Sequence, residues 1–196
     1  SLLLEYLTPS RKYLDTAANP QDLENARKFF ELDVQVVDAV GDIAGSCSVR
    51  SRLADVVWRL GDEDQAIEHL HRSLEIANQS ENHENQIFAL VGEAKYRFQQ
   101  HKQDRAAALL DEAMTVFDDW NQKQKPEERI TAKSWDSMKG NVSFAFRLLR
   151  SALAATWDNS SAVGFDWPED PKWDSHLRAK IDALRIRFDH SPKDEE

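Results

Sequence analysis

The chain has 196 residues, of which 41% are hydrophobic and 31% are charged, and its formal net charge is -10. A chain of this length can bury one sizeable core, and its low content of six Gly and six Pro favours a helical protein over a disordered or β-rich one. The negative charge argues against the basic surface that binding to nucleic-acid phosphates requires. We therefore expect no nucleic-acid partner.

The chain contains a single cysteine, Cys47, so it can form no intramolecular disulfide and has no cysteine pair to hold a metal ion. The opening residues, Ser1 to Leu4, include no basic leader, and their apolar run is far too short to cross a bilayer. We therefore predict a cytoplasmic protein with no membrane partner. Because the chain starts without Met inside an apolar pattern, we also expect it to be a segment of a longer protein.

The first residues predict the end of one helix and the start of another. Residues 1–7 are expected to be the tail of a preceding helix, because Thr8-Pro9 interrupts the apolar pattern. Asn19-Pro20 then predicts a helix start, with Asn as the N-cap and Pro at the first helical position.

One apolar pattern recurs four times along the chain and indicates an internal repeat. Each copy has a small residue, a large residue four positions later, a small or polar residue at seven and a large residue at eight, all on one helical face. The offsets between successive copies are 40, 40 and 39 residues. The copies are Ala26, Phe30, Asp33 and Val34; Ala66, Leu70, Ser73 and Leu74; Ala106, Leu110, Ala113 and Met114; and Ala145, Leu149, Ala152 and Leu153.

A second amphipathic segment precedes each of the last three copies, so each unit is predicted to be a helix, a turn and a helix. Gly61-Asp62 marks one turn, because Gly favours a left-handed helix exit and Asp can cap the next helix. The polar, turn-forming residues 78–85 are predicted to separate the second unit from the third, and residues 125–128 predict the start of the fourth. The pattern positions of these first helices are Leu53, Ala54, Val57 and Trp58; Leu90, Ala94 and Phe98; and Ile130, Ser134 and Met138.

The second unit resembles the tetratricopeptide repeat, which has a small residue in its first helix, Gly-Asp at the turn, and Ala-Ile followed by Ala-Leu in its second helix. The matching residues are Leu53-Ala54, Gly61-Asp62, Ala66-Ile67, Leu70 and Ser73-Leu74-Glu75-Ile76. The resemblance covers about residues 8–157 and implies an all-α fold, a right-handed superhelical stack of about four antiparallel helical hairpins (an α-solenoid). The period near 40 exceeds the usual period of about 34 residues. We therefore expect a long-period variant, in which the helices or the connecting loops are extended.

The character of the sequence changes after Trp157, so the repeat array is expected to occupy residues 1–157. Residues 158–170 are rich in turn formers and predict a loop, residues 171–190 predict a C-terminal capping helix that covers the open end of the stack, and the charged residues 191–196 predict a disordered tail. The expected buried positions of the last helix are Trp173, Leu177, Ile181, Leu184, Ile186 and Phe188.

The sequence contains no phosphate-binding loop, nucleophile elbow or zinc-protease motif. His71 and Glu75 lie one helical turn apart, but two surface ligands without supporting groups make a poor metal site, so solvated surface is the preferred interpretation. The carboxylate pair Asp118-Asp119 diverges on a helix and cannot act as a paired acid and base. We therefore predict no catalytic residue, no metal site, no cofactor and no enzyme activity.

The resemblance implies that a partner binds in the concave groove, which the first helix of each hairpin lines. The expected partner-binding residues are Arg59, Phe88, Val91, Lys95, Gln99 and Trp135; the same faces carry Ser48, Ser51, Asp55 and Thr131. Ser51 and Asp55 stand where chaperone-binding relatives have Lys and Asn, so a clamp for a terminal carboxylate is not expected. The alternative interpretation of Phe88, Val91 and Trp135 is ordinary core between helices.

These features predict a non-enzymatic protein-protein interaction scaffold that binds a peptide or helix of a partner in the concave groove. Basic residues fall on the first helices while the second helices are more acidic, a contrast that could steer an acidic peptide. The alternative function is a ligand- or peptide-responsive regulatory domain of a larger signalling protein. A third and least favoured alternative is an enzyme built on a helical-repeat frame. The sequence does not define an oligomeric state.

Overall fold

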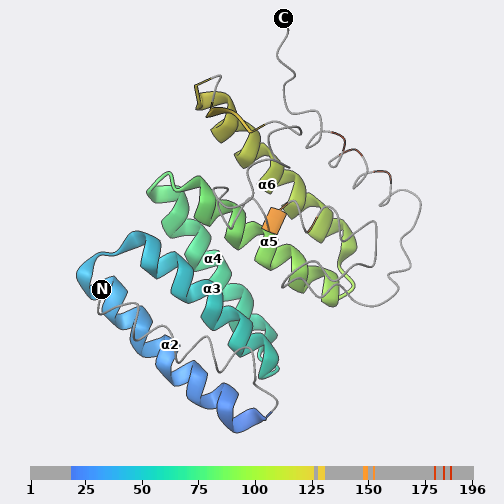
Figure 1. Cartoon of the computed structure of the whole chain (residues 1–196). Helices are drawn as coiled ribbons and strands as arrows, with labels where there is room; N and C mark the ends of the chain where they lie inside the picture. Colours follow the sequence, from blue (N-terminus) through green and yellow to red (C-terminus); the bar gives the residue numbers. More distant parts are fainter. Residues whose placement is uncertain are drawn as a thin grey trace, which may run out of the picture. The chain divides into compact units, whose positions relative to one another are not determined.

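The computed structural model describes residues 19–125, 128–130, 148–149, 152, 179, 183 and 186. Within these residues the regular elements are helical and no β-strand occurs. The continuous helices are α2 (Pro20–Val40), α3 (Ile43–Arg59), α4 (Glu63–Gln79), α5 (His83–Gln99) and α6 (Gln103–Lys123), as Figure 1 shows. The chain divides into two compact units, Ser1–Asn85 and Gln86–Glu196.

The four connections between these helices share one turn geometry. A residue in the left-handed region follows each of the helices α2 to α5, at positions 41, 61, 81 and 101, so one falls every twenty residues. In each turn this residue donates its N–H to the carbonyl three residues back, and the next residue donates to the carbonyl five residues back, as in Asp62 N to Val57 O at 3.1 Å. This is the Schellman arrangement, which satisfies carbonyls that the helix end would otherwise leave open. The connections span two or three residues, and the helices that they join have 17 or 21 residues.

Side-chain caps begin four of the helices. Asn19 accepts from Asp22 N at 2.9 Å at the start of α2, and Asp62 accepts from Gln65 N at 3.1 Å at the start of α4. These contacts confirm both helix starts expected from Asn19-Pro20 and Gly61-Asp62. Asp42 caps α3 and Asn82 caps α5 in the same way, whereas α6 starts without a side-chain cap.

The expected separation within residues 78–85 is present but short, because α4 continues to Gln79 and α5 begins at His83. The polar residues of this segment complete the helix ends. The hydroxyl of Ser80 donates to Ile76 O at 2.9 Å in the last turn of α4, and Asn82 accepts from the first turn of α5. A polar run can therefore mark two helix termini as well as a long loop.

In the first unit, α3 packs against both α2 and α4. The small residues of the repeat permit this approach, because Ala26 of α2 and Ala66 of α4 are both fully buried. A small polar cluster lies within the α3–α4 contact: Ser73 of α4 donates its hydroxyl to Cys47 O at 3.1 Å, and the Cys47 thiol donates to Ser73 O at 3.4 Å. These bonds fix the register of the two helices, since each residue satisfies a polar group of the other.

In the second unit, α5 and α6 are joined by a three-residue turn and bury a mainly apolar core. One exception is Glu93, whose side chain is 3% exposed and lies 2.9 Å from the guanidinium of Arg97 one turn along α5. Two described positions of the fourth repeat copy, Leu149 and Ala152, are fully buried as the pattern predicts. Ile130 is also buried, but it lies outside a helix rather than in the expected first helix of the fourth unit.

Several predicted features lie outside the described residues: the helix tail over 1–7, the loop over 158–170 and the tail over 191–196. Of the predicted capping helix, Ala179, Ala183 and Ile186 are described, and all three are helical and exposed. Ile186 was expected to be buried, and this expectation is wrong because its side chain is 58% exposed. The expected buried set included positions 184 and 186, and residues two apart point to different sides of a helix, so one helix face cannot bury both.

Candidate partner-binding face

Equivalent sides of α3 and α5 remain partly exposed. The α3 face consists of Ser48, Arg52, Asp55 and Arg59, and the α5 face consists of Phe88, Gly92, Lys95 and Gln99. Residues at steps of four, three and four lie on one side of a helix. Each member of the α3 face corresponds to the α5 residue forty positions later, and all eight are exposed or half-buried. The repeat therefore preserves this accessible side in both hairpins.

Two of the expected groove residues are instead buried at equivalent positions. Val91 of α5 is fully buried, and Ser51 of α3 is 7% exposed. The Ser51 hydroxyl donates to Cys47 O at 3.0 Å and lies 3.3 Å from the Ser73 hydroxyl, inside the α3–α4 contact. These two positions lie beside the partly exposed faces and are turned towards the core. Thr131 and Trp135 lie outside the described residues.

Both signs of charge occur on the α3 face. The guanidinium of Arg59 lies 3.0 Å from the carboxylate of Asp55 one turn earlier, and both side chains are partly exposed. Arg52 lies close enough to α2 that its charge lowers the pKa of Asp33, although burial raises that pKa by more. Two arginines and one aspartate thus leave this face with a positive balance.

The α5 face combines an apolar side chain, a glycine and a cation. Phe88 and Lys95 are half-buried, and the Lys95 ammonium lies 5.8 Å from the ring centroid of Tyr96. Gly92 lies between them on the same side, where the missing side chain lets another backbone approach the helix. Gly92 and Arg52 were not among the residues predicted for the groove. They are forty residues apart, so the repeat offset makes them equivalent members of the two faces.

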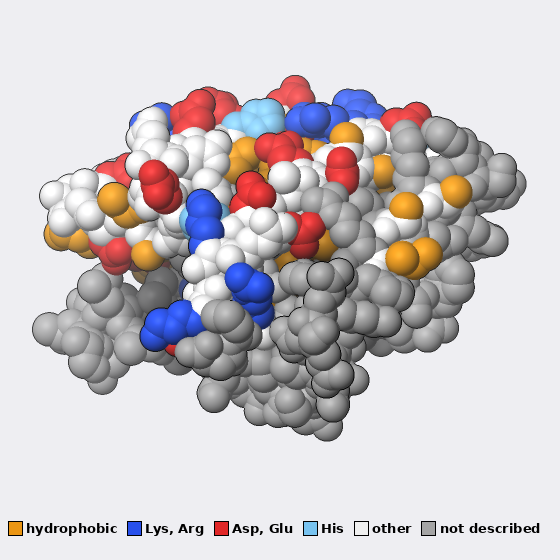
Figure 2. All heavy atoms as spheres, turned by 90° about the horizontal axis from the view of Figure 1, so that it is seen from above, with side chains coloured by type: hydrophobic (Ala, Val, Ile, Leu, Met, Phe, Trp, Pro, Cys, Tyr) orange, Lys and Arg blue, Asp and Glu red, His pale blue; other side chains and the backbone are white. Residues whose placement is uncertain are grey.

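The charge of the helices alternates along the chain. Helix α3 has two more basic than acidic residues, and α5 has equal numbers. Helices α2, α4 and α6 each have three more acidic than basic residues. Acidic and basic side chains are interspersed on the face shown in Figure 2. The two helices that carry the candidate faces are therefore the least acidic of the five.

The described ranges contain no group of three or more His, Cys, Asp or Glu side chains that could hold a metal ion. Among the helices of the same ranges, none has the length and apolar character needed to cross a membrane.

One family model matches the chain, and its description is tetratricopeptide repeat. The match covers residues 45–119, from the first turn of α3 to the last turns of α6, and confirms the resemblance over these two hairpins. No curated protein and no solved structure matches the chain.

Proposed function

We propose, on the premise that residues 45–119 form tetratricopeptide repeats, that this protein is a non-enzymatic scaffold whose first helices bind a segment of another protein. Repeats of this family generally mediate protein-protein interaction. The finer proposal is that the α3 face and the α5 face each contact an extended or helical peptide segment, as helical proteins do.

One observation carries this proposal: the same four register positions stay accessible on α3 and on α5, while the position beside them is buried in both. Core packing alone requires only that buried positions forty residues apart stay small or apolar. The accessible positions differ in chemistry between the two helices, as Ser48 and Phe88 do. Such variation gives each hairpin its own contact with a partner.

The chemistry of the faces defines the kind of segment that would bind. Phe88 offers partly exposed apolar area, and aromatic side chains supply much of the binding energy in protein interfaces. Lys95 lies on the same side one turn beyond Gly92 and would attract a carboxylate. We infer a partner segment with an apolar side chain close to an acidic residue. Gln99 and Arg59 would add polar contacts to the partner. Trp135, which lies outside the described residues, stays a predicted partner contact. Val91 is buried and would support the surface from the core.

Selection of peptides from a displayed random library on the full chain tests this function. We expect the selected peptides to combine an apolar and an acidic residue. Their affinity should fall roughly tenfold or more on Phe88→Ala or on Lys95→Glu, because each change removes an anchor from the interface. Titration calorimetry or fluorescence anisotropy measures the change in Kd.

Lys102→Glu is the matched control, since it makes the same charge change at an exposed residue between α5 and α6. It should leave the Kd of the selected peptides within about twofold of the wild-type value. Peptides that bind the Lys95→Glu and Phe88→Ala variants as tightly as wild type would place the binding surface elsewhere and contradict the proposed site.

A further inference from the structure

Gly92 places a residue without a side chain in the middle of α5. The described part of the chain contains three other glycines, and each of them has a local role. Gly41 and Gly61 adopt the left-handed conformation at turns, and Gly45 leaves room for the cap of α3. Gly92 lies within a helix, where Gly is less stabilising than Ala, so its presence has a different cause.

The equivalent position of α3 shows that a hairpin of this repeat accommodates a large side chain at this place. Arg52 stands there, forty residues before Gly92, and is half-buried. Residues 51–56 and 91–96 have the same order of buried and half-buried positions, so the two helices present this position in the same way. Packing within the hairpin therefore does not account for the missing side chain of Gly92.

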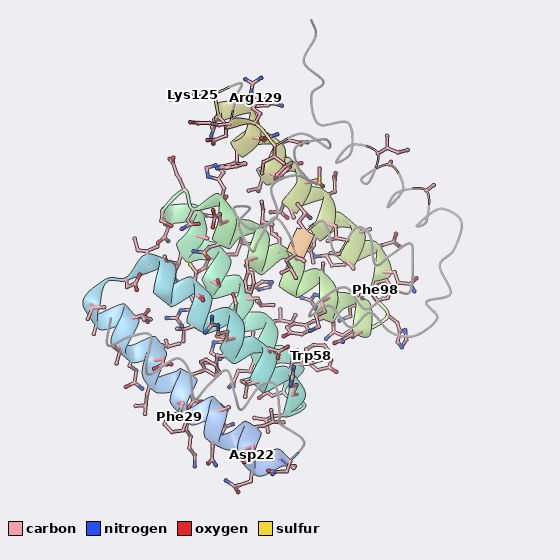
Figure 3. All side chains as sticks on the ribbon, viewed as in Figure 1. Asp22, Phe29, Trp58, Phe98, Lys125 and Arg129 are labelled. Carbon is pink, nitrogen blue, oxygen red and sulfur yellow. The ribbon has the colours of Figure 1, made fainter. Side chains whose placement is uncertain are left out.

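Gly92 lies between the two anchors of the proposed α5 contact. Phe88 is one helical turn before it and Lys95 is about one turn after it, and both are half-buried on the same side of the helix. The core begins directly beside this face, because Val91 and Phe98, the second of which is labelled in Figure 3, are buried. A segment that contacts both anchors therefore passes close to the backbone of Gly92.

We propose that Gly92 is the point of closest approach between α5 and the partner segment, and that the partner presents a small residue there. This inference rests on the proposed function and adds a third requirement to the partner. The small residue lies between the apolar residue that contacts Phe88 and the acidic residue that contacts Lys95. Because Gly has no Cβ atom, the two backbones can approach closely enough for its Cα–H groups to contact a carbonyl oxygen of the partner.

Substitutions at Gly92 test this inference with the peptides selected on the full chain. Gly92→Ala adds one methyl group and should raise the Kd of these peptides roughly tenfold, and the larger side chain of Gly92→Arg should raise it further. Replacing the small residue of the peptide with Leu should weaken its binding to the wild-type protein to a similar extent. Gly92→Ala should also raise the Tm of the free protein, because Ala favours the helix. Titration calorimetry measures the Kd, and circular dichroism measures the Tm.

Ala108→Arg is the matched control, because it introduces the same large cation at an exposed position of α6. It should leave the Kd within about twofold of the wild-type value. The inference is overturned if Gly92→Ala lowers the Tm, since the glycine would then serve packing within the chain.

The comparison with Phe88→Ala separates this inference from the proposed function. If Phe88→Ala weakens peptide binding while Gly92→Ala leaves it unchanged, the α5 face binds the partner but Gly92 is not the point of closest approach. If both variants bind as tightly as wild type, the proposed site itself is contradicted.

Discussion

Asn121, in the last turn of α6, holds the backbone of Ile130 through both ends of its side-chain amide. Its Nδ2 donates to Ile130 O at 2.9 Å, and its Oδ1 accepts from Ile130 N at 2.8 Å. The two residues are 1% and 5% exposed, so water does not compete for these bonds. Arg129 adds bonds to the carbonyls of Gln124 at 3.3 Å and Gln122 at 3.2 Å. The segment that follows α6 is thereby tied back to the end of that helix.

We expect Asn121→Leu to lower the free energy of unfolding by about 1–3 kcal/mol, because it leaves the N–H and the carbonyl of Ile130 buried without partners. Urea denaturation followed by circular dichroism measures the loss. Gln122→Ala is the control at the next and exposed position, and it should change the unfolding free energy by less than about 0.5 kcal/mol. Equal stability of the two variants would show that the amide contacts contribute little.

Gly45, in the first turn of α3, is required by the cap that begins the helix. A Cβ atom at this position would lie 2.4 Å from Oδ2 of Asp42 and 3.2 Å from Cγ1 of Val37. The backbone N–H of Gly45 is also the group that Asp42 caps, at 2.9 Å. Gly45→Ala should therefore displace the cap and destabilise the protein by about 1–2 kcal/mol, although Ala is normally the better helix former.

A double-mutant cycle with Asp42→Ala checks this cause. Because Asp42→Ala removes the carboxylate that the new methyl group would strike, Gly45→Ala should cost at least about 0.5 kcal/mol less in that background. If the two costs simply add, the strain does not come from the contact with Asp42.

His69 of α4 should make the stability of the protein dependent on pH. Burial lowers the pKa of its imidazole below 6.5, the nearby charge of Arg50 lowers it further, and Glu68, Glu31 and Asp62 partly oppose this shift. The unfolded chain therefore binds a proton more tightly than the folded protein does. Stability that is present above pH 6.5 is lost as the pH falls from that value through the lower folded-state pKa.

Urea midpoints measured between about pH 7.5 and 5.5 test this dependence. We expect His69→Gln to flatten the loss of stability across this range relative to wild type. His71→Gln serves as the control, because His71 is an exposed histidine on the same helix. An unchanged slope in His69→Gln would assign the pH dependence to other groups.

Two of the four left-handed turn residues carry a side chain that this conformation disfavours. Glu81 has a φ of 52° and His101 a φ of 59°, whereas the equivalent residues of the earlier turns are Gly41 and Gly61. Glu81→Gly and His101→Gly should each raise the unfolding free energy by about 1 kcal/mol, because Gly adopts this region without the clash of a Cβ atom. Thermal unfolding measures the gain. Gly61→Ala should produce a loss of similar size, and a loss in all three variants would contradict the argument.

Sequence reasoning predicted the helices and their contacts where the determinants are local. The close approach of neighbouring helices needs a small residue, and Ala26, Ala66 and Ala106 are all at most 1% exposed. The caps at Asn19 and Asp62 were likewise predictable, because a capping side chain bonds to an N–H only three residues away.

The candidate faces were predicted less well, because they depend on small rotations around the helix. Val91 differs from the half-buried Phe88 by three positions, which turns its side chain about 60° away from Phe88 and into the core. Ile130 was expected in the first helix of the fourth unit, but it lies outside a helix, and the contact with Asn121 rather than helix periodicity positions it. Contacts of this kind leave no periodic signal in a single sequence.

The left-handed residues at positions 41, 61, 81 and 101 also define where the chain can change its length. A residue inserted within a helix rotates every later side chain of that helix by about 100°, which would carry Ser73 away from Cys47 or turn the α5 face inward. A residue inserted at an exposed turn leaves each helix in its own register. Homologous chains of different length are therefore expected to differ at the turns, while the helices between them keep their 17-residue span.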